Sequence, residues 1–391
     1  MNTTFLPFLQ KSLVIAISAI LANMATSVAN AQDALIKLDG TTGTSGSISL
    51  SPNPVTLITK IDGGGVTPNG TVNGSNLFFS FSDFGVQALH TALFTCTTGC
   101  TGVNNVISRV SGVGSDHISD INGKLTSNIG TANFWFFNPN GVIFGAGAEI
   151  NVPAAFHIGT ANSLSFSSGS LPSTPTEITS TLVSGNPTSF CFSGSAGDIT
   201  INGSNITIAG GSTEIASAKD ISINNGAHIT ASSEALDISA QGNLTIDNAS
   251  KITASNSGDS HISAGSTGST TIDSTHTSIG SVSATGGNLR VAAGGIIEKT
   301  DGAGELSVAA KSGSVANTGK VTVTGTTSAI NTTSGHTGAA TIAGDTALLV
   351  DQLGAINLAN GGAASVTAGT SLDVGNATGT VGQEGTITAT N

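Results

Sequence analysis

The side chains best suited to chemistry are two cysteines that stand close together, Cys96 and Cys100, in the sequence CTTGC. In an oxidising compartment this spacing allows a small disulfide loop. A zinc site would need two further ligands with their own spacing, and only His90 lies near. We therefore interpret the pair as a candidate disulfide and not as a metal centre. Cys191 is then left as a free thiol.

Groups that would catalyse a reaction are sparse. The seven His residues are scattered and form no HExxH pair. The sequence Gly258-Asp259-Ser260-His261 is similar to a hydrolase motif, but it lies in a turn and not on the strand-to-helix elbow that exposes a nucleophile. Enzymes that cleave polysaccharides need carboxylates that converge on one face, and the acidic residues here do not recur in register. We therefore expect no enzyme, no cofactor and no catalytic, cofactor-binding or metal residues.

The charge balance limits the partners. The chain has 11 Lys and Arg against 23 Asp and Glu, a formal net charge of −12. Binding to phosphates requires a clustered basic face, so no nucleic-acid partner is expected. Since only 9% of the residues are charged, solubility must come from hydroxyl and amide groups.

The N-terminus has the order of features found in secretory signal peptides. Lys11 is the only charged residue before Asp33, and the apolar run SLVIAISAILA covers residues 12–22. Small residues follow, so we expect a signal peptidase to cut between Ala31 and Gln32. The apolar run is shorter than the ~20 residues of a spanning helix. Residues 1–31 are therefore predicted to be a signal peptide, and the mature chain is predicted to have no membrane span.

The elements that follow must differ on the two sides of residue 193. All 15 Phe, the single Trp, all nine Pro and all three Cys lie at or before Phe192, and residues 193–391 contain no Tyr or Met either. A long segment without large side chains cannot bury an ordinary globular core, but it can form a solenoid in which coils stack on one another. We interpret residues 32–192 as one domain and residues 193–391 as a repetitive passenger, either complete or truncated.

A repeat supports the solenoid. Two short strands with alternating apolar residues flank a turn in each unit. Successive units begin 22, 23 and 26 residues apart, and they are DITINGSNITIA (Asp198–Ala209), DISINNGAHITA (Asp220–Ala231), NLTIDNASKITA (Asn243–Ala254) and STTIDSTHTSIG (Ser269–Gly280). In the first unit we expect four side chains to point inward (Ile199, Ile201, Ile206, Ile208) and two to point outward (Thr200, Thr207).

This pattern predicts an all-β fold, a right-handed parallel β-helix. Beyond residue 290 the repeat degenerates, but strand-like tetrads persist at residues 306–309, 321–324 and 365–368.

The most specific motif is NFWFFNPNGVIFGAGAEINV at Asn133–Val152. Its centre, Asn138-Pro139-Asn140-Gly141, predicts a type I turn, because Pro139 presets φ and Asn and Gly complete the turn. The aromatic run at residues 134–137 is either a docking patch or, as we favour, packing between coils and covering strands. Upstream, Asn76-Leu77-Phe78 begins a second aromatic segment, and Val106–Gly112 and Ile121–Gly123 lie between the two.

In this order, the motifs resemble the haemagglutination-activity, or two-partner-secretion, domain of filamentous-haemagglutinin-like exoproteins, over about residues 35–165. There are departures: Val113 stands where the family has a second Gly, and Phe79 stands where it often has His. The resemblance implies a β-helix with N-terminal capping strands and extra-helical hairpins. It also implies that Asn138, Pro139, Asn140 and Gly141, with Asn76, Leu77 and Phe78, belong to the secretion motif.

The resemblance further implies a route out of a Gram-negative cell. The chain would cross the periplasm, be recognised by the periplasmic domains of a dedicated outer-membrane barrel transporter, and fold outside as a secreted or surface-bound adhesin. Its receptor, on a host cell, on another surface or on a glycan, is left open by the sequence. A cytolysin of the same family is the alternative function, and a β-helix enzyme that degrades polysaccharide is a more distant one.

Overall fold

The computed structural model describes the strands of the chain and most of the connections before residue 255. The described residues are 36–42, 46–48, 57–174, 183–193, 196–232, 234, 236–246, 250–254, 261–264, 270–272, 275–277, 281–285, 289–291, 296–299, 306–311, 320–324, 329–332, 339–344, 347–351, 355–359, 363–369, 371–375 and 386–390. The predicted signal peptide and the site between Ala31 and Gln32 lie outside these ranges.

Strands dominate the described residues, and they form five sheets. The first sheet has 14 strands: β1 (Ile36–Leu38), β2 (Gly46–Ser47), β4 (Gly70–Asn73), β5 (Asn76–Phe84), β7 (Asn105–Val110), β10 (Asn133–Phe137), β13 (Phe156–Gly159), β19 (Thr213–Ser217), β22 (Leu236–Ala240), β25 (His261–Ala264), β28 (Ser281–Thr285), β31 (Leu306–Lys311), β34 (Ala340–Gly344) and β37 (Ala364–Ala368). The second sheet has 10 strands: β8 (Ser119–Ile121), β11 (Val142–Phe144), β17 (Ile199–Asn202), β20 (Ile221–Asn224), β23 (Leu244–Ile246), β26 (Thr270–Ile272), β29 (Leu289–Val291), β32 (Lys320–Thr324), β35 (Ala347–Asp351) and β38 (Ser371–Gly375).

The remaining strands form three smaller sheets. The third sheet has four strands: β3 (Ile58–Asp62), β6 (Thr91–Thr95), β9 (Lys124–Ser127) and β12 (Glu149–Asn151). The fourth sheet has eight strands: β18 (Asn205–Ile208), β21 (His228–Ala231), β24 (Lys251–Ala254), β27 (Thr275–Thr277), β30 (Ile296–Lys299), β33 (Ala329–Thr332), β36 (Ala355–Ala359) and β39 (Thr386–Thr390). The fifth, which we call the covering sheet, contains β14 (Ser163–Phe166), β15 (Gly169–Pro172) and β16 (Pro187–Cys191). A single 3₁₀ turn, η1 (Ser115–His117), completes the described elements.

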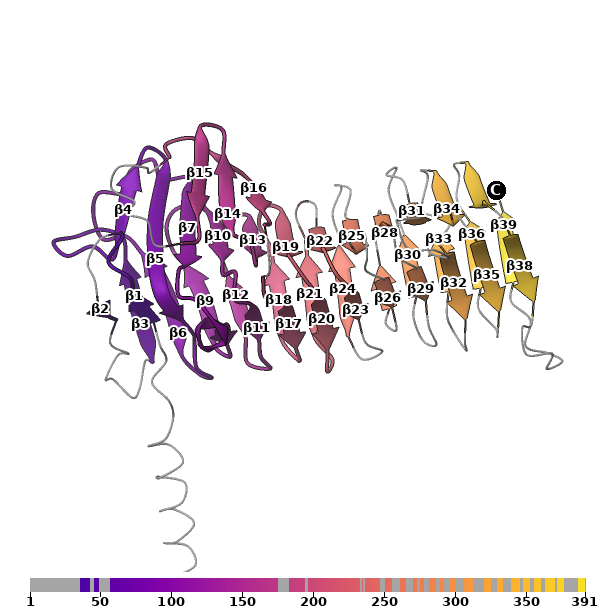
Figure 1. Ribbon diagram of the computed structural model, residues 1–391, viewed down its shortest axis with the longest axis horizontal. Coiled ribbons are helices and arrows are strands. Elements are labelled where there is room, and N and C mark those ends of the chain that lie inside the picture. Colours follow the sequence, from indigo (N-terminus) through magenta and orange to yellow (C-terminus); the bar gives the residue numbers. More distant parts are fainter. Residues whose placement is uncertain are drawn as a thin grey trace, which may run out of the picture. The chain divides into compact units, whose positions relative to one another are not determined.

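The chain winds as a parallel β-helix. Each coil contributes one strand to the first sheet, one to the second, and one to the third or the fourth, and then returns to the first (Figure 1). Within the coils, strands pair in parallel with their equivalents one coil later, as β10 does with β13 and β11 with β17, but β12 and β18 are not paired. The antiparallel strands are β1, β2 and β4, which extend the N-terminal edge of the first sheet, and the covering sheet. The predicted fold class is therefore confirmed.

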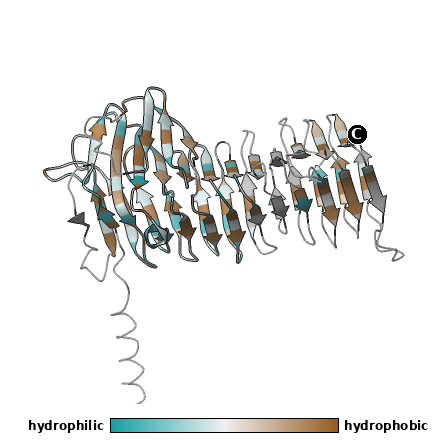
Figure 2. Ribbon diagram, viewed as in Figure 1, coloured by the Kyte–Doolittle hydropathy of each residue, from teal (hydrophilic) through white to brown (hydrophobic). Residues whose placement is uncertain are grey.

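Alternation along the strands creates the core. Ile199, Ile201, Ile206 and Ile208 are buried, while Thr200 is half-buried and Thr207 is exposed, as the repeat predicts. Figure 2 shows apolar and polar residues alternating along the strands. Because successive coils pair in register, buried residues form columns along the helix axis. One such column contains Ile215, Ile238 and Ile262.

The core changes from aromatic to aliphatic along the chain. Between β5 and β13, phenylalanine rings contact one another across coils, with centroids 4.9 Å apart for Phe94 and Phe134 and 5.0 Å apart for Phe84 and Phe136. After β16 the columns contain Ile, Leu, Val and Ala. The first and second sheets continue across residue 193, through β13 to β19 and β11 to β17. The division of the chain at residue 193 stays a prediction.

The irregular repeat beyond residue 254 is also in register. Leu244 pairs with Thr270, which is the 26-residue offset read from the sequence. The three tetrads expected after residue 290 fall within β31, β32 and β37. The spacing between equivalent strands varies because the connections vary in length, while the paired strands remain three to six residues long. A search of the sequence for a fixed repeat length therefore misses these coils, although their strands pair in register.

Candidate secretion determinant

The NPNG motif forms a corner between the first and second sheets, directly after β10. The N–H of Gly141 donates to the backbone oxygen of Asn138 at 3.2 Å, which closes a four-residue turn. The side-chain Oδ1 of Asn138 also accepts from the N–H of Asn140 at 2.9 Å. Both bonds join residues within four positions of each other. The turn that the sequence predicts is present, and it is held by local contacts.

The side chain of Asn138 is fully buried and joins this corner to the preceding coil. Its Nδ2 donates to the backbone oxygen of His117 at 2.7 Å and to Oγ of Ser119 at 2.9 Å. An apolar residue at this position would leave the backbone oxygen of His117 and the buried hydroxyl of Ser119 without this donor, which favours Asn here.

Asn140 makes a second set of contacts with the preceding coil. Its Nδ2 donates to the backbone oxygen of Gly112 at 2.7 Å, and its Oδ1 accepts from the N–H of Gly114 at 3.0 Å. Through these two bonds the Asn140 side chain supplies the hydrogen-bond partners that a neighbouring backbone would otherwise provide to residues 112–114, the loop that contains Val113. Val113 itself is 81% exposed beside the corner.

The following coil packs closely against the corner from the other side. The N–H of Gly197 donates to the backbone oxygen of Pro139 at 2.7 Å, and a Cβ at Gly197 would overlap the carbonyl of Asn140. Gly141 has a φ of +126°, and a Cβ there would lie 3.1 Å from the backbone oxygen of Asp198. Glycine is required at Gly141 by its backbone conformation and at Gly197 by this close approach.

The second part of the predicted motif lies at the opposite end of the same sheet. Asn76 begins β5 and is buried, and it pairs in register with Asn105, which pairs with Asn133 at the start of β10. Asn138 follows the end of β10, about 16 Å away at 3.3 Å per residue. The structure therefore does not bring Asn76 and the NPNG corner together.

Asn76 has a role of its own in attaching an excursion of the chain. Its Nδ2 donates to the backbone oxygens of Val183 at 2.9 Å and Gly185 at 2.7 Å, and its Oδ1 accepts from Nδ2 of Asn105 at 2.9 Å. Its neighbours Leu77 and Phe78 are both fully buried, on opposite faces of the sheet: Leu77 in the main core, Phe78 against Phe166 of the covering sheet.

A buried arginine, which motif matching alone did not single out, joins three segments. Arg109 is fully buried in β7, and its guanidinium donates to the backbone oxygens of Pro172 at 2.7 Å and Thr174 at 3.0 Å, and to Oγ1 of Thr41 at 2.9 Å. Burial lowers the pKa of Arg109 to about 10, although nearby Asp39 opposes the shift. The burial of an arginine could not be inferred from its place in a Val-Ile-Ser-Arg-Val strand.

Asp39 is the counter-charge, and hydroxyl groups surround it. Its Oδ2 lies 3.9 Å from Nη2 of Arg109 and accepts from Ser80 and Ser111, each at 2.6 Å. Burial raises the pKa of Asp39, but the hydrogen bonds from Ser111, Ser80 and Thr41 outweigh it and hold the pKa below the ordinary 3.8. The charged network connects the N-terminal strand β1 to the coils and to the covering sheet.

A comparison with families of known proteins agrees with this organisation. The model of the TPS secretion domain matches residues 34–281, which is more than half of the chain. The chain belongs to the TPS secretion domain family. It is therefore a secreted two-partner-secretion exoprotein, exported with a cognate outer-membrane transporter. No curated protein matches the sequence.

The aromatic run of this TPS domain is packed on both faces of β10. Phe134 and Phe136 point into the core, while Trp135 and Phe137 lie beneath the covering sheet with Phe190. The interpretation as packing is therefore correct. On the same outer face, the ring of Trp135 stacks on His157, with centroids 3.6 Å apart, and Nδ1 of His157 lies 2.9 Å from Glu214.

The cysteines of the TPS domain lie on two different elements. Cys96 and Cys100 are joined by a disulfide in the connection after β6, and Cys191 is a free thiol in β16, with its Sγ 2.8 Å from Oγ of Ser165. No cluster of three or more His, Cys, Asp or Glu side chains suited to a metal ion occurs in the described ranges. The described part of the chain also contains no helix with the length and hydrophobicity needed to span a bilayer.

Proposed function

We propose that the NPNG corner is the element that the periplasmic domains of the transporter recognise. The observation that carries this proposal is the local character of the turn. The bonds from Gly141 to the carbonyl of Asn138 and from Asn140 to its side chain link close neighbours, so the turn can form in a chain that has not yet folded. The contacts of Asn140 with residues 112–114 need the preceding coil and form only when the helix assembles.

A secretion assay with two matched glycine variants tests this role. Gly141→Ala strains the NPNG turn, where φ is +126° and the new Cβ would lie 3.1 Å from a backbone oxygen. Gly203→Ala is the control: φ is +66°, and its Cβ would lie 3.3 Å from the backbone oxygen of Asn225 in a turn of the repeat. Gly203→Ala should destabilise the fold by about 1 kcal/mol, and Gly141→Ala by more, because φ +126° lies outside the left-handed region, so export is compared after the free energy of unfolding of each variant has been measured.

The chain is co-expressed with its cognate transporter, and the protein in the medium is measured against the protein retained in the periplasm. We expect Gly141→Ala to reduce export strongly and Gly203→Ala to leave it close to wild type. Unchanged export of Gly141→Ala would refute the proposal. Equal losses for both variants would assign the effect to folding and would refute it as well.

We propose further that the coils act outside the cell as an adhesin rod and not as an enzyme. Support comes from the outward row of the fourth sheet, where Thr207 pairs with Thr230, Thr230 with Thr253, and Asn331 with Asn357. The last pair is joined by a side-chain hydrogen bond of 3.0 Å. Most positions of this row carry hydroxyl or amide groups, with Glu298 at the same register between Thr277 and Asn331, and such a row suits extended contact with a receptor. It does not offer converging carboxylates for hydrolysis.

Three measurements on the purified secreted chain separate the adhesin from its alternatives. An adhesin should bind host cells in a saturable manner, without releasing dye from lipid vesicles and without shortening polysaccharide chains. Dye release would favour a cytolysin, and depolymerisation would favour an enzyme. Either result would overturn the adhesin proposal.

A further inference from the structure

The connection between the first and second sheets differs in length between successive coils. In the coil that contains β5, only Gly85 separates this strand from Val86, which bridges to Ile121 of β8. In the next coil, residues 111–118 separate β7 from β8 and include the 3₁₀ turn η1. We call this longer connection the η1 loop. It contacts the NPNG corner of the coil that follows.

The η1 loop occupies the side-chain amides of the NPNG corner. The amide of Asn140 is bound at both ends, by the backbone oxygen of Gly112 at 2.7 Å and by the N–H of Gly114 at 3.0 Å. Nδ2 of Asn138 donates to the backbone oxygen of His117 at 2.7 Å. The two amide side chains of the motif are therefore both engaged by one loop of the preceding coil.

The backbone of the corner is engaged as well. The oxygen of Gly141 accepts from the N–H of Ser119 at 3.1 Å, directly after the η1 loop, and the oxygen of Pro139 accepts from the N–H of Gly197 at 2.7 Å. Breaking a buried hydrogen bond without replacing it is costly. A second protein could bind these groups in the folded chain only by displacing the partners that the fold supplies.

The η1 loop is anchored at a place that includes no residue of the motif. Nδ1 of His117 lies 2.6 Å from Oδ1 of Asp83 in β5 and 3.1 Å from the backbone oxygen of Ser82. Gly112 packs against the same strand, because a Cβ there would overlap the oxygen of Ser82 and the ring of His117. The loop can therefore be loosened by substitutions that leave the NPNG sequence unchanged.

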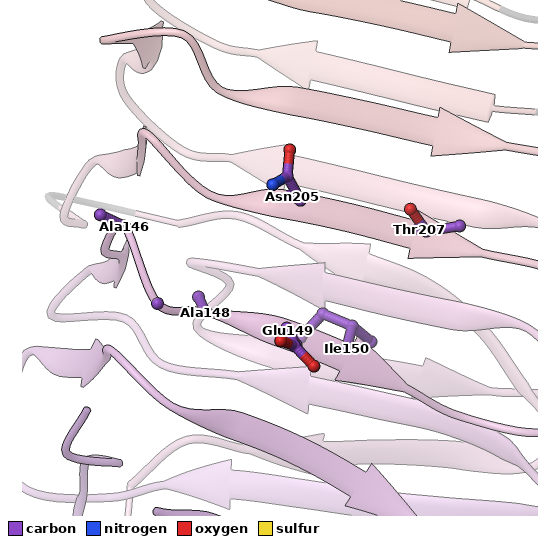
Figure 3. A pocket seen from close by; sticks show the side chains of 7 residues that line it. Ala146, Ala148, Glu149, Ile150, Asn205 and Thr207 are labelled. Carbon is purple, nitrogen blue, oxygen red and sulfur yellow. The ribbon is translucent and has the colours of Figure 1, made fainter. Parts of the chain in front are cut away.

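The other corner of the same coil shows that such cover is not a general property of corners. Between β11 and β12, Ala146 is exposed and lines a surface groove (Figure 3). At the NPNG corner, in contrast, Asn138 is fully buried and Asn140 is half-buried. The fold closes the corner that carries the motif and leaves the neighbouring corner open.

We propose that the η1 loop and the transporter compete for the amide groups of Asn138 and Asn140, so that folding of the first coils releases the chain from the transporter. Before the coils assemble, the local turn presents these groups. Once the η1 loop docks, they are occupied. A site that is open in only a fraction of the molecules binds with its affinity reduced by that fraction. This competition rests on the proposed role of the NPNG corner and explains how its recognition ends.

Surface plasmon resonance on the cognate transporter, held in lipid nanodiscs, tests the competition. The purified secreted chain is applied either folded or diluted from urea immediately before injection, and Trp135 fluorescence followed in parallel gives the time available before folding. We expect the unfolded chain to bind and the folded chain to bind about a hundredfold more weakly. Equal affinity of the two states would overturn the proposal.

Two matched glycine variants locate the effect. A Cβ would overlap backbone oxygens of the preceding coil in both, at Ser82 for Gly112→Ala and at Gln87 and His90 for Gly123→Ala, but only Gly112 belongs to the η1 loop. We expect folded Gly112→Ala to bind the transporter about tenfold more tightly than folded wild type, because the loop is displaced. Gly123→Ala should bind as wild type. Equal affinities of the two folded variants would overturn the proposal.

A second pair of variants avoids new side chains in the tightly packed loop. Asp83→Ala removes the anchor of His117, and its control, Glu214→Ala, removes the similar partner of His157. Folded Asp83→Ala should bind the transporter more tightly, and the amide of Gly114 should exchange its hydrogen faster as its bond to Asn140 opens. Glu214→Ala should match wild type in both measurements. Tighter binding of Asp83→Ala without faster exchange at Gly114 would contradict the competition.

Gly141→Ala, applied as an unfolded chain, separates this competition from the recognition on which it rests. If it binds as well as unfolded wild type, the transporter does not recognise the NPNG corner, and both proposals fail. If it binds more weakly while folded wild type binds as well as unfolded wild type, the corner is recognised and only the competition is wrong.

Discussion

The coils before residue 193 and those after it share one backbone plan but are stabilised differently. In the first group, side chains join segments that are distant in sequence, as Asn76 does with Val183 across 107 residues and Arg109 with Pro172 across 63. In the second group, each strand pairs with its equivalent in the neighbouring coils, and the core repeats Ile, Leu and Val. We therefore expect the early coils to unfold as one unit and the later coils to add stability one neighbour at a time.

This difference bears on export. Contacts between successive coils can form as the chain emerges, because each coil needs only the coil before it. The network of Arg109 requires segments near residues 39, 109 and 174 to be present together. A chain that is threaded outward would therefore complete its N-terminal unit only after about 140 residues are free, whereas the later coils can fold as they arrive.

Removal of an aromatic core ring should destabilise the whole N-terminal unit. Phe136 is fully buried and lies 5.0 Å from the ring of Phe84, so Phe136→Ala should lower the free energy of unfolding by about 4 kcal/mol. Ile238→Ala, in the same register column three coils later, should cost about 3 kcal/mol. Hydrogen exchange should show lost protection from β5 to β13 for the first variant and only near β22 for the second. If both variants lost hydrogen-exchange protection only near the substituted strand, the proposed difference between the early and the later coils would be wrong.

Loss of the buried arginine should be nearly as severe. Arg109→Met leaves Asp39 without its counter-charge and removes the donors to Pro172 and Thr174, so we expect a loss of about 3 kcal/mol. The exposed Arg290 of β29 provides the control, and Arg290→Met should change stability by less than about 0.5 kcal/mol. Urea unfolding followed by far-UV circular dichroism measures both, because Trp135 lies in β10 and does not report on β29. If the two variants unfold at the same urea concentration, Arg109 does not hold the unit together.

The sequence predicted the repeated coils and the local turn better than the contacts that occur only once in the fold. Ile199 and Ile206 were assigned correctly because alternation decides which face is buried, and the NPNG turn because its residues act locally. The partners of Asn140 at Gly112 and Gly114 could not be predicted, since they depend on which coil lies beneath the corner.

An aromatic residue placed in the aliphatic coils should not be accommodated. Ile238 is buried in a column between Ile215 and Ile262, so Ile238→Phe overfills a space that Ile and Val occupy in every coil nearby. We expect a loss of about 2 kcal/mol in thermal or urea unfolding. Ser222→Phe, at an outward position of β20, brings the same ring without overpacking and should be close to neutral. A neutral Ile238→Phe would show that core size does not distinguish the two regions.

Acid should affect the N-terminal unit before the later coils. The carboxyl groups of Asp39 and Asp62 both have a pKa below the ordinary 3.8, because hydrogen bonds from neighbouring hydroxyl and N–H groups outweigh burial. A carboxyl group whose pKa is lower in the folded state stabilises the fold above pH 3.8 and loses this contribution as the pH falls through the folded-state pKa. Trp135 fluorescence should therefore report weakening of β1 and its contacts below about pH 4. In Asp39→Asn this dependence should flatten, since the substituted side chain no longer titrates. A pH profile unchanged by the substitution would mean that other groups govern the acid response.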